Sequence, residues 1–172
     1  HDKLIMKNSE EIKVGYLVAY DYEYLKYSLP TVYEYADKIV LAIDKNRKTW
    51  IGQSFDISPE FFIWLKDFDR ENKISIYEEE LAVLGLGSME SEVRARNLLA
   101  QYLGEGGWHL QIDVDEYFID FKGFVDYLRS LEYNKIPLSI YAKWITIFKQ
   151  EGEDFFLIDS NELFPLASNK PQ

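Results

Sequence analysis

Short apolar runs alternate along the chain with longer segments in which apolar residues recur every three or four positions. The short runs are rich in β-branched and aromatic residues and are bounded by polar ones, a pattern typical of buried strands. They predict strands at 13–20, 38–44, 73–79 and 108–114. Near the end, 137–150 alternates closely enough to predict one long strand, and 155–159 is also strand-like.

The longer segments between these strands have the apolar spacing of helices. Pro30 lies inside the first of them and is expected to kink that helix or split it in two. Ser58 followed by Pro59 is a typical start for the second helix, and Gly104 suits the end of the third. The predicted helices cover 22–37, 58–65, 88–104 and 121–131.

This alternation predicts an α/β fold, with a mostly parallel sheet and helices on both faces. The 172 residues suffice for a single domain, 1–172, and no linker-like or low-complexity segment divides them. In such sheets, ligands bind beyond the carboxyl ends of the strands. The residues that follow each strand are therefore the first place to look for chemistry.

The composition excludes several classes of partner. A net charge of −11 disfavours a broad nucleic-acid interface and anionic lipid, and an anionic ligand would need a local cation. The absence of cysteine excludes disulfides and thiolate metal sites. No apolar run approaches the roughly 20 residues of a membrane span, and no signal peptide is visible. We expect a cytoplasmic protein with no transmembrane segment, with a peripheral position at the inner face of the membrane as an open alternative.

The stretch 106–118, GGWHLQIDVDEYF, ends an apolar strand in three carboxylates. Asp113 and Asp115 point to the same side, roughly 6–7 Å apart, so both stay charged only beside a cation or with a raised pKa. Asp21 follows the first strand and Asp44 ends the second, so three acidic clusters are expected at one edge. Oxygen ligands favour Mg²⁺ or Mn²⁺, with substrate phosphate oxygens completing the shell.

Two other origins of an Asp-x-Asp motif are disfavoured. An EF-hand loop starting at Asp113 requires Gly at 118 and Glu at 124, where Phe118 and Phe124 stand. A haloacid-dehalogenase-type phosphatase usually has Thr or Val two residues after the motif, near the start of its domain. Here Tyr117 stands at that position, and the motif lies on the fourth strand. A solvated acidic turn remains as the alternative without function.

The order of these motifs resembles the GT-A fold of inverting family 2 glycosyltransferases over about residues 13–120. AYDYEYL is similar to the family's Tyr-Asn-Glu-Glu-x-Leu-like run after the first strand. ARNLLAQYLGEGGWHLQIDVDE is similar to its helix with Ala-Arg-Asn and the strand that leads into the Asp-x-Asp motif. The matching residues are Tyr20, Asp21, Glu23, Leu25, Asp44, Ala95, Arg96, Asn97, Asp113, Asp115 and Glu116.

The resemblance implies a GT-A domain, nucleotide-diphospho-sugar transferase-like and Rossmann-like, with a mostly parallel sheet flanked by helices. Such a domain transfers a sugar from a UDP- or GDP-linked donor to a hydroxyl of a glycan or lipid-linked acceptor, here in surface polysaccharide synthesis. It further implies that Asp115, with Asp113, holds Mg²⁺ or Mn²⁺. The implied nucleotide-sugar-binding residues are Tyr20, Asp21, Asp44, Arg96, Asn97 and Asp113.

The sequence departs from the family pattern after the second strand. The usual Asp-Asp-Gly-Ser is replaced by Asp44-Lys45-Asn46-Arg47, and the segment 48–55 has no counterpart in the pattern. These departures indicate a subfamily, for which the resemblance does not assign the base or the donor.

The catalytic base and acceptor region of the family lie well downstream of the Asp-x-Asp motif, whereas this chain ends about 57 residues after Asp115. We therefore expect a truncated chain that binds a nucleotide sugar and transfers the sugar poorly. Glu153 and Asp154 are the late candidates for a base, in a predicted hairpin turn. The alternatives are a catalytically incomplete nucleotide-sugar-binding domain, or a nucleotidyltransferase, whose expected Gly-rich basic loop after the first strand is missing.

Four other side chains have both structural and functional interpretations. Arg94 contacts diphosphate or pairs with Glu90 on the helix surface. His109, in mid-strand, is more typical of a structural histidine than of a base. Trp50 lies in a polar loop and is available for stacking on a base or sugar, whereas Trp144 is expected to pack in the core.

Overall fold

The computed structural model of the protein describes residues 11–131, 136–159 and 161–170. Its strands are β1 (Ile12–Val18), β2 (Lys38–Asp44), β3 (Ile74–Glu79), β4 (Trp108–Asp113), β5 (Ser139–Lys143), β6 (Thr146–Glu151), β7 (Asp154–Ile158) and β8 (Leu163–Ser168). Its helices are the 3-10 turn η1 (Tyr22–Tyr24), α2 (Leu25–Val32), α3 (Pro59–Phe68), α4 (Ser88–Leu103) and α5 (Phe121–Ser130). The α/β class is confirmed, as are the first four strands and the four predicted helical regions.

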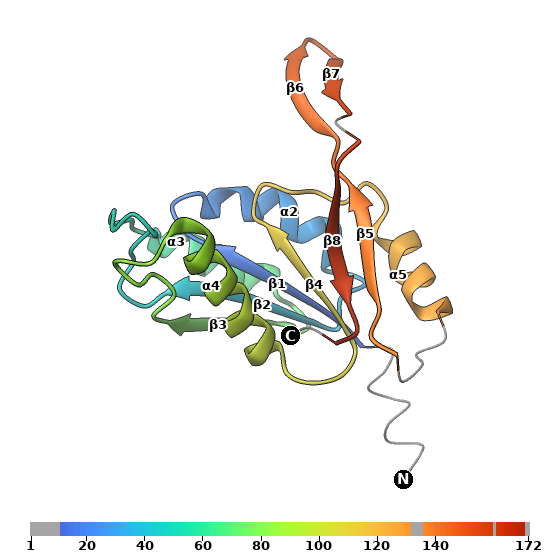
Figure 1. Cartoon of the computed structure of the whole chain (residues 1–172). Helices are drawn as coiled ribbons and strands as arrows, with labels where there is room; N and C mark the ends of the chain where they lie inside the picture. The colour runs from blue at the N-terminus through green and yellow to red at the C-terminus, as the bar shows by residue number, and fades with distance from the viewer. Residues whose placement is uncertain (1–10, 132–135, 160, 171–172) are drawn as a thin grey trace.

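Six strands form the main sheet, in the order β3-β2-β1-β4-β8-β5 (Figure 1). β1 pairs in parallel with β2 on one side and with β4 on the other, and β3 is parallel to β2. Because four neighbouring strands run the same way, their carboxyl ends reach the same edge of the sheet. The strand order reverses between β1 and β4, which is the usual place for a ligand in an open α/β sheet.

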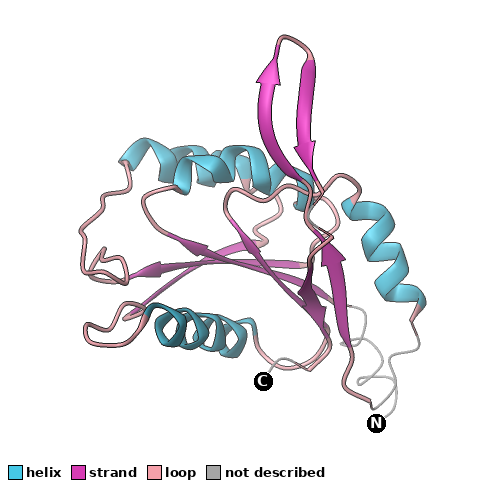
Figure 2. Cartoon of the chain, turned by 45° about the horizontal axis from the view of Figure 1, so that its top comes forward, coloured by secondary structure: helices cyan, strands magenta, loops and turns pink. Residues whose placement is uncertain are grey.

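The sheet lies between two helical layers (Figure 2). On one face, α2, α3 and α5 pack with apolar residues of β1, β2 and β4 into the larger core, whereas α4 forms a smaller core on the other face. Trp108, Leu110 and Ile112 of β4 enter the larger core. Because side chains alternate along a strand, His109 and Gln111 point to the α4 face.

α4 is held close to the sheet at two places. A Cβ atom added at Gly15 of β1 would come within 2.8–3.0 Å of the Leu99 side chain, so glycine permits the close approach of helix and strand. At the other end, Lys13 Nζ donates to the carbonyl groups of Gly104 and Glu105, at 3.1 and 2.8 Å. These contacts fix α4, whose first half borders the site described below.

The prediction of one long strand at 137–150 is wrong. The chain forms β5 in the main sheet, leaves the sheet at Trp144–Ile145 and continues as β6 in a two-stranded hairpin with β7. Local alternation cannot reveal this break, because both strands alternate and only the pairing partners differ. β8, which returns antiparallel between β4 and β5, supplies the pairing that holds β5 in the main sheet.

Pro30 does not split its helix. It lies within α2, and the helix ends two residues later, at Val32. The missing proline N–H is therefore accommodated in the last turns of a short helix.

The β6–β7 hairpin projects beyond the main sheet (Figure 1). Its apolar side chains, including Phe148 and Phe155, are exposed. None of the helices in the described part of the chain combines the length and apolar character that a membrane span requires.

Candidate functional site

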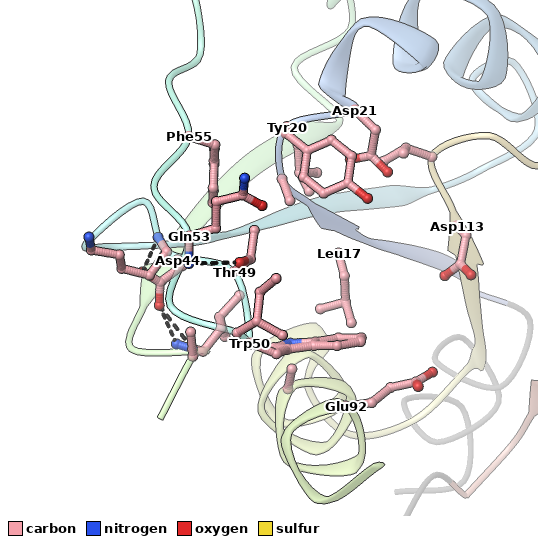
Figure 3. Close-up of a pocket in the computed structure, with 18 of the residues that line it drawn as sticks. Leu17, Tyr20, Asp21, Asp44, Thr49, Trp50, Gln53, Phe55, Glu92 and Asp113 are labelled. Carbon is pink, nitrogen blue, oxygen red and sulfur yellow. Dashed lines mark hydrogen bonds between the residues drawn. The ribbon is translucent and has the colours of Figure 1, made fainter. Parts of the chain in front are cut away.

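A cavity of about 590 Å³ lies where the strand order reverses, bordered by the carboxyl ends of β1, β2 and β4 and by the first half of α4. Asp21, Asp44, Asp113 and Asp115 all line it. The expected convergence of the acidic clusters at one edge is therefore confirmed. Figure 3 shows Asp44 on one side of this first cavity and Asp113 with Glu92 on the other.

The Asp44 carboxylate is buried and accepts four backbone hydrogen bonds. Its Oδ1 accepts from the N–H groups of Asn46 and Lys48, at 2.9 and 3.0 Å. Its Oδ2 accepts from the N–H groups of Leu81 and Ala82, at 2.9 and 3.0 Å. A carboxylate has about four acceptor positions, and all are used. Asp44 therefore joins the loops that follow β2 and β3, a structural role that the sequence does not reveal.

The segment 48–55, which departs from the family pattern, forms one wall of the first cavity. It folds back on itself through a bridge between Lys48 and Ser54, and the Thr49 N–H donates to the Gln53 carbonyl at 2.8 Å. The loop places Trp50 in the cavity wall, with 38% of its surface exposed. Trp50 is thus available for stacking on a planar ligand.

The Asp113 carboxylate forms an ion pair with the Arg96 side chain of α4. Arg96 Nη2 donates to Asp113 Oδ1 at 2.9 Å, and Arg96 Nε donates to Glu92 Oε1 at 3.0 Å. Burial lowers the pKa of Arg96, but Asp113 and Glu92 together raise it above the ordinary value. Arg96 therefore lies at the site, where it is held by two carboxylates.

Asp21 lies across the cavity from the α4 side and has an unsatisfied oxygen. Its Oδ1 is buried and accepts no hydrogen bond from the described residues. Burial raises the pKa of Asp21, and the negative charges of Asp115 and Asp113 raise it further. A cation or a hydrogen-bond donor placed between these three carboxyl groups would relieve the repulsion.

The loop after β4 is held in place by Glu116 and Ser28. Glu116 Oε2 accepts from the Asp113 N–H at 2.9 Å, and Ser28 Oγ donates to the Glu116 carbonyl at 2.7 Å. Burial raises the pKa of Glu116, and Asp113 and Asp115 add to the effect. Asp115 itself is exposed at the cavity mouth.

The donor set of this site fits Mg²⁺ or Mn²⁺ because it consists of hard carboxylate oxygens, including the unsatisfied Oδ1 of Asp21. Among the described residues, no group of three or more His, Cys, Asp or Glu side chains is arranged to hold a metal ion. A cation at Asp113 and Asp115 would therefore need further oxygens from the ligand or from water.

Several residues singled out in the sequence lie away from this cavity. Asn97 follows Arg96 on α4 but is exposed and does not line the cavity. Arg94 donates to the carbonyl groups of Glu80 and Leu81, so it supports the loop after β3. Glu153 and Asp154 lie at the tip of the projecting hairpin (Figure 1), in neither of the two described cavities.

A second cavity, of about 390 Å³, adjoins the first and shares the residues Glu92, Arg96 and Asp113 with it. His109 lines this second cavity and is only 4% exposed. Neither of its ring nitrogens makes a hydrogen bond of normal geometry. The carbonyl groups of Gly104 and Gly106 are nevertheless close enough to raise the pKa of the ring slightly against the effect of burial. Burial, followed by the charge of Lys13, lowers the pKa of His109 to about 4, so the ring is neutral at pH 7.

Three residues of the site escaped the sequence analysis. Glu92, Thr49 and Gln53 line the first cavity but were not among the predicted site residues. The signal for Glu92 was its spacing of four residues from Arg96, which places both on one side of a helix. Nothing local identifies Thr49 or Gln53, because their position depends on how the loop folds back.

The sequence was also compared with known proteins. No family model and no curated protein matches it.

Replacing Asp44 by asparagine tests its structural role. The amide offers one accepting oxygen instead of two, so two buried N–H donors lose their acceptor, at about 1–3 kcal/mol each. We expect a melting temperature at least roughly 4 °C lower, since 1 kcal/mol corresponds to roughly 2–4 °C in a domain of this size.

Asp56→Asn is the matched control, because Asp56 is an exposed carboxylate close to the same loop. Its effect should stay within about 0.5 kcal/mol. An Asp44→Asn variant as stable as the parent would show that the two hydrogen bonds it loses carry no net stability.

His109 predicts a specific dependence of stability on pH. Its pKa is about 4 in the folded chain and about 6.5 when unfolded, so only the unfolded chain binds this proton between those values. The stability contributed by the neutral ring is complete above pH 6.5 and falls as the pH falls, by about 2 kcal/mol at pH 5. Between pH 7.5 and pH 5, the free energy of unfolding of the parent should fall by about 2 kcal/mol more than that of His109→Gln. Denaturant titrations of both proteins at the two pH values measure this difference. An identical pH dependence in the two proteins would rule out the lowered pKa.

Proposed function

We propose that the protein is a metal-dependent glycosyltransferase of the GT-A type, resembling inverting family 2. It takes a sugar from a UDP- or GDP-linked donor and transfers it to a hydroxyl of a glycan or lipid-linked acceptor, in surface polysaccharide synthesis. The observation that carries the proposal is the first cavity, where Asp21, Asp113 and Asp115 converge at the reversal of the strand order.

The fold supports this proposal in two respects. The four parallel strands β3-β2-β1-β4, followed by an antiparallel strand, agree with the mostly parallel sheet that the resemblance implies. The cavity is also large enough for a nucleotide and combines an aromatic wall at Trp50 with an acidic end at Asp113.

The residues of the cavity divide into two groups. Trp50 and the loops held by Asp44 form the wall against which a nucleoside would lie. Asp113 and Asp115 would hold Mg²⁺ or Mn²⁺, and the cation would neutralise the diphosphate and so stabilise the leaving group. When a cation is bound, Arg96 can exchange its contact with Asp113 for a contact with a phosphate oxygen.

A second candidate is a domain that binds a nucleotide sugar without transferring it. The observation in its favour is the position of Glu153 and Asp154 at the hairpin tip, because a general base must lie within hydrogen-bond reach of the acceptor. Nucleotide release measured with a panel of acceptors separates the two candidates. Turnover that is lost in Asp154→Asn would favour the enzyme, and tight binding without turnover would favour the binding domain.

A thermal-shift measurement tests the metal-dependent nucleotide site. A nucleoside diphosphate at 100 times its Kd stabilises the folded chain by about 2.7 kcal/mol, or roughly 5–10 °C for this size. We expect UDP or GDP to raise the melting temperature more with Mn²⁺ or Mg²⁺ than with EDTA. Asp115→Asn should remove the metal-dependent part of the shift.

Glu153→Gln is the matched control, because it neutralises an exposed carboxylate that lies outside the cavities. Its shifts should equal those of the parent. The proposal fails if neither nucleotide shifts the melting temperature, or if the shifts with metal and with EDTA are the same.

A further inference from the structure

The second cavity begins where the first one ends. Glu92, Arg96 and Asp113 line both, so the ion pair between Arg96 and Asp113 stands at the junction. From the first cavity to the second, the order is therefore the wall at Trp50, the carboxylates at the end of β4, and the second cavity.

The floor of the second cavity is polar although it is formed by a central strand. His109 and Gln111 of β4 point into it from the α4 face. Gln111 Nε2 donates to the Arg96 carbonyl at 2.9 Å, but Gln111 Oε1 is buried and accepts no hydrogen bond from the described residues. Gln111 Oε1 is therefore a buried acceptor on the floor of the cavity, and it suits a ligand with a hydroxyl group.

An aromatic side chain forms another wall of this cavity. Trp144 is stacked on Phe164, with ring centroids 4.5 Å apart, and remains 41% exposed. Trp144 therefore lines the cavity and does not pack in the core as the sequence predicted. A rigid, half-exposed indole beside hydrogen-bonding groups suits the apolar face of a sugar ring.

The charges of the second cavity disfavour an anionic ligand. Its described lining includes three carboxyl groups and one permanent cation, Arg96, which is already paired with Glu92 and Asp113. His109 is neutral at pH 7 because burial lowers its pKa. A carboxylate on the ligand would meet Glu92 and Glu116 without an unpaired basic partner among the described lining residues.

We propose that the second cavity binds the sugar of the nucleotide-sugar donor, and that it selects neutral sugars over uronic acids. This rests on the proposed function, in which the nucleoside occupies the first cavity. A nucleotide sugar has its diphosphate between the nucleoside and the sugar. If the diphosphate lies at Asp113, the sugar extends into the second cavity, whose floor offers Gln111 Oε1 to a hydroxyl group and whose lining repels a carboxylate.

Two nucleotide sugars that differ at one carbon provide the test. UDP-glucose and UDP-glucuronic acid differ only in a hydroxymethyl or carboxylate group, and GDP-mannose and GDP-mannuronic acid form the same pair for guanosine. Calorimetric titrations with Mn²⁺ should show the neutral member of the preferred pair binding at least about tenfold more tightly than its uronic acid.

The Trp144→Ala variant connects this preference to the cavity. It should weaken binding of the neutral nucleotide sugar by about 2–10-fold, the range that corresponds to the loss of an aromatic contact, and leave binding of the free nucleoside diphosphate unchanged. Phe148→Ala is the matched control, because Phe148 is an exposed aromatic residue of the hairpin that does not line the cavity. It should change neither affinity.

The outcomes separate this proposal from the function on which it rests. If neither UDP nor GDP binds, the proposed function fails and the sugar site fails with it. If a nucleoside diphosphate binds but the uronic acid binds as tightly as its neutral counterpart, the sugar proposal alone is overturned. The same holds if Trp144→Ala binds the neutral nucleotide sugar as tightly as the parent does.

Discussion

Parallel pairing of β1 with β2 on one side and β4 on the other is the constraint on which the site depends. It brings the residues after three strands, far apart in the sequence, to one edge of the sheet. The apolar interior fixes this register, because a shift of one residue would turn Trp108 and its neighbours out of the larger core. The packing that stabilises the sheet therefore also sets the spacing of the carboxylates.

The cost of this arrangement is electrostatic repulsion at the acidic edge. Asp21, Asp113 and Asp115 lie close enough for two of them to raise the pKa of the third. In the described structure, Arg96 from α4 offsets part of this charge, at a position fixed by the close packing of α4 on β1. A divalent cation would offset this charge more completely and would also attract the anionic diphosphate, and this links the fold to the proposed function.

Much of the fold and part of the site follow from the sequence, and particular residues show where such prediction ends. The apolar runs placed the first four strands, and the acidic residues after them placed Asp21, Asp44, Asp113 and Asp115 in one cavity, because both depend on local pattern and on parallel topology. The role of Asp44 was not predictable, since its four hydrogen bonds come from two loops that meet only in the folded chain. The break at Trp144 was hidden for a similar reason, because alternation does not say which partner a strand pairs with. Asn97 shows the converse, as a motif position that the helix turns away from the cavity.

We propose that a cation at Asp113 and Asp115 lies between a nucleoside in the first cavity and a sugar in the second. A crystal structure with Mn²⁺ and the preferred nucleotide sugar, with the metal located by its anomalous scattering, would show whether this is so. We expect one manganese ion bound to these carboxylates and to the diphosphate, with the base near Trp50 and the sugar ring near Trp144. Manganese bound elsewhere, or a sugar ring outside the second cavity, would contradict it.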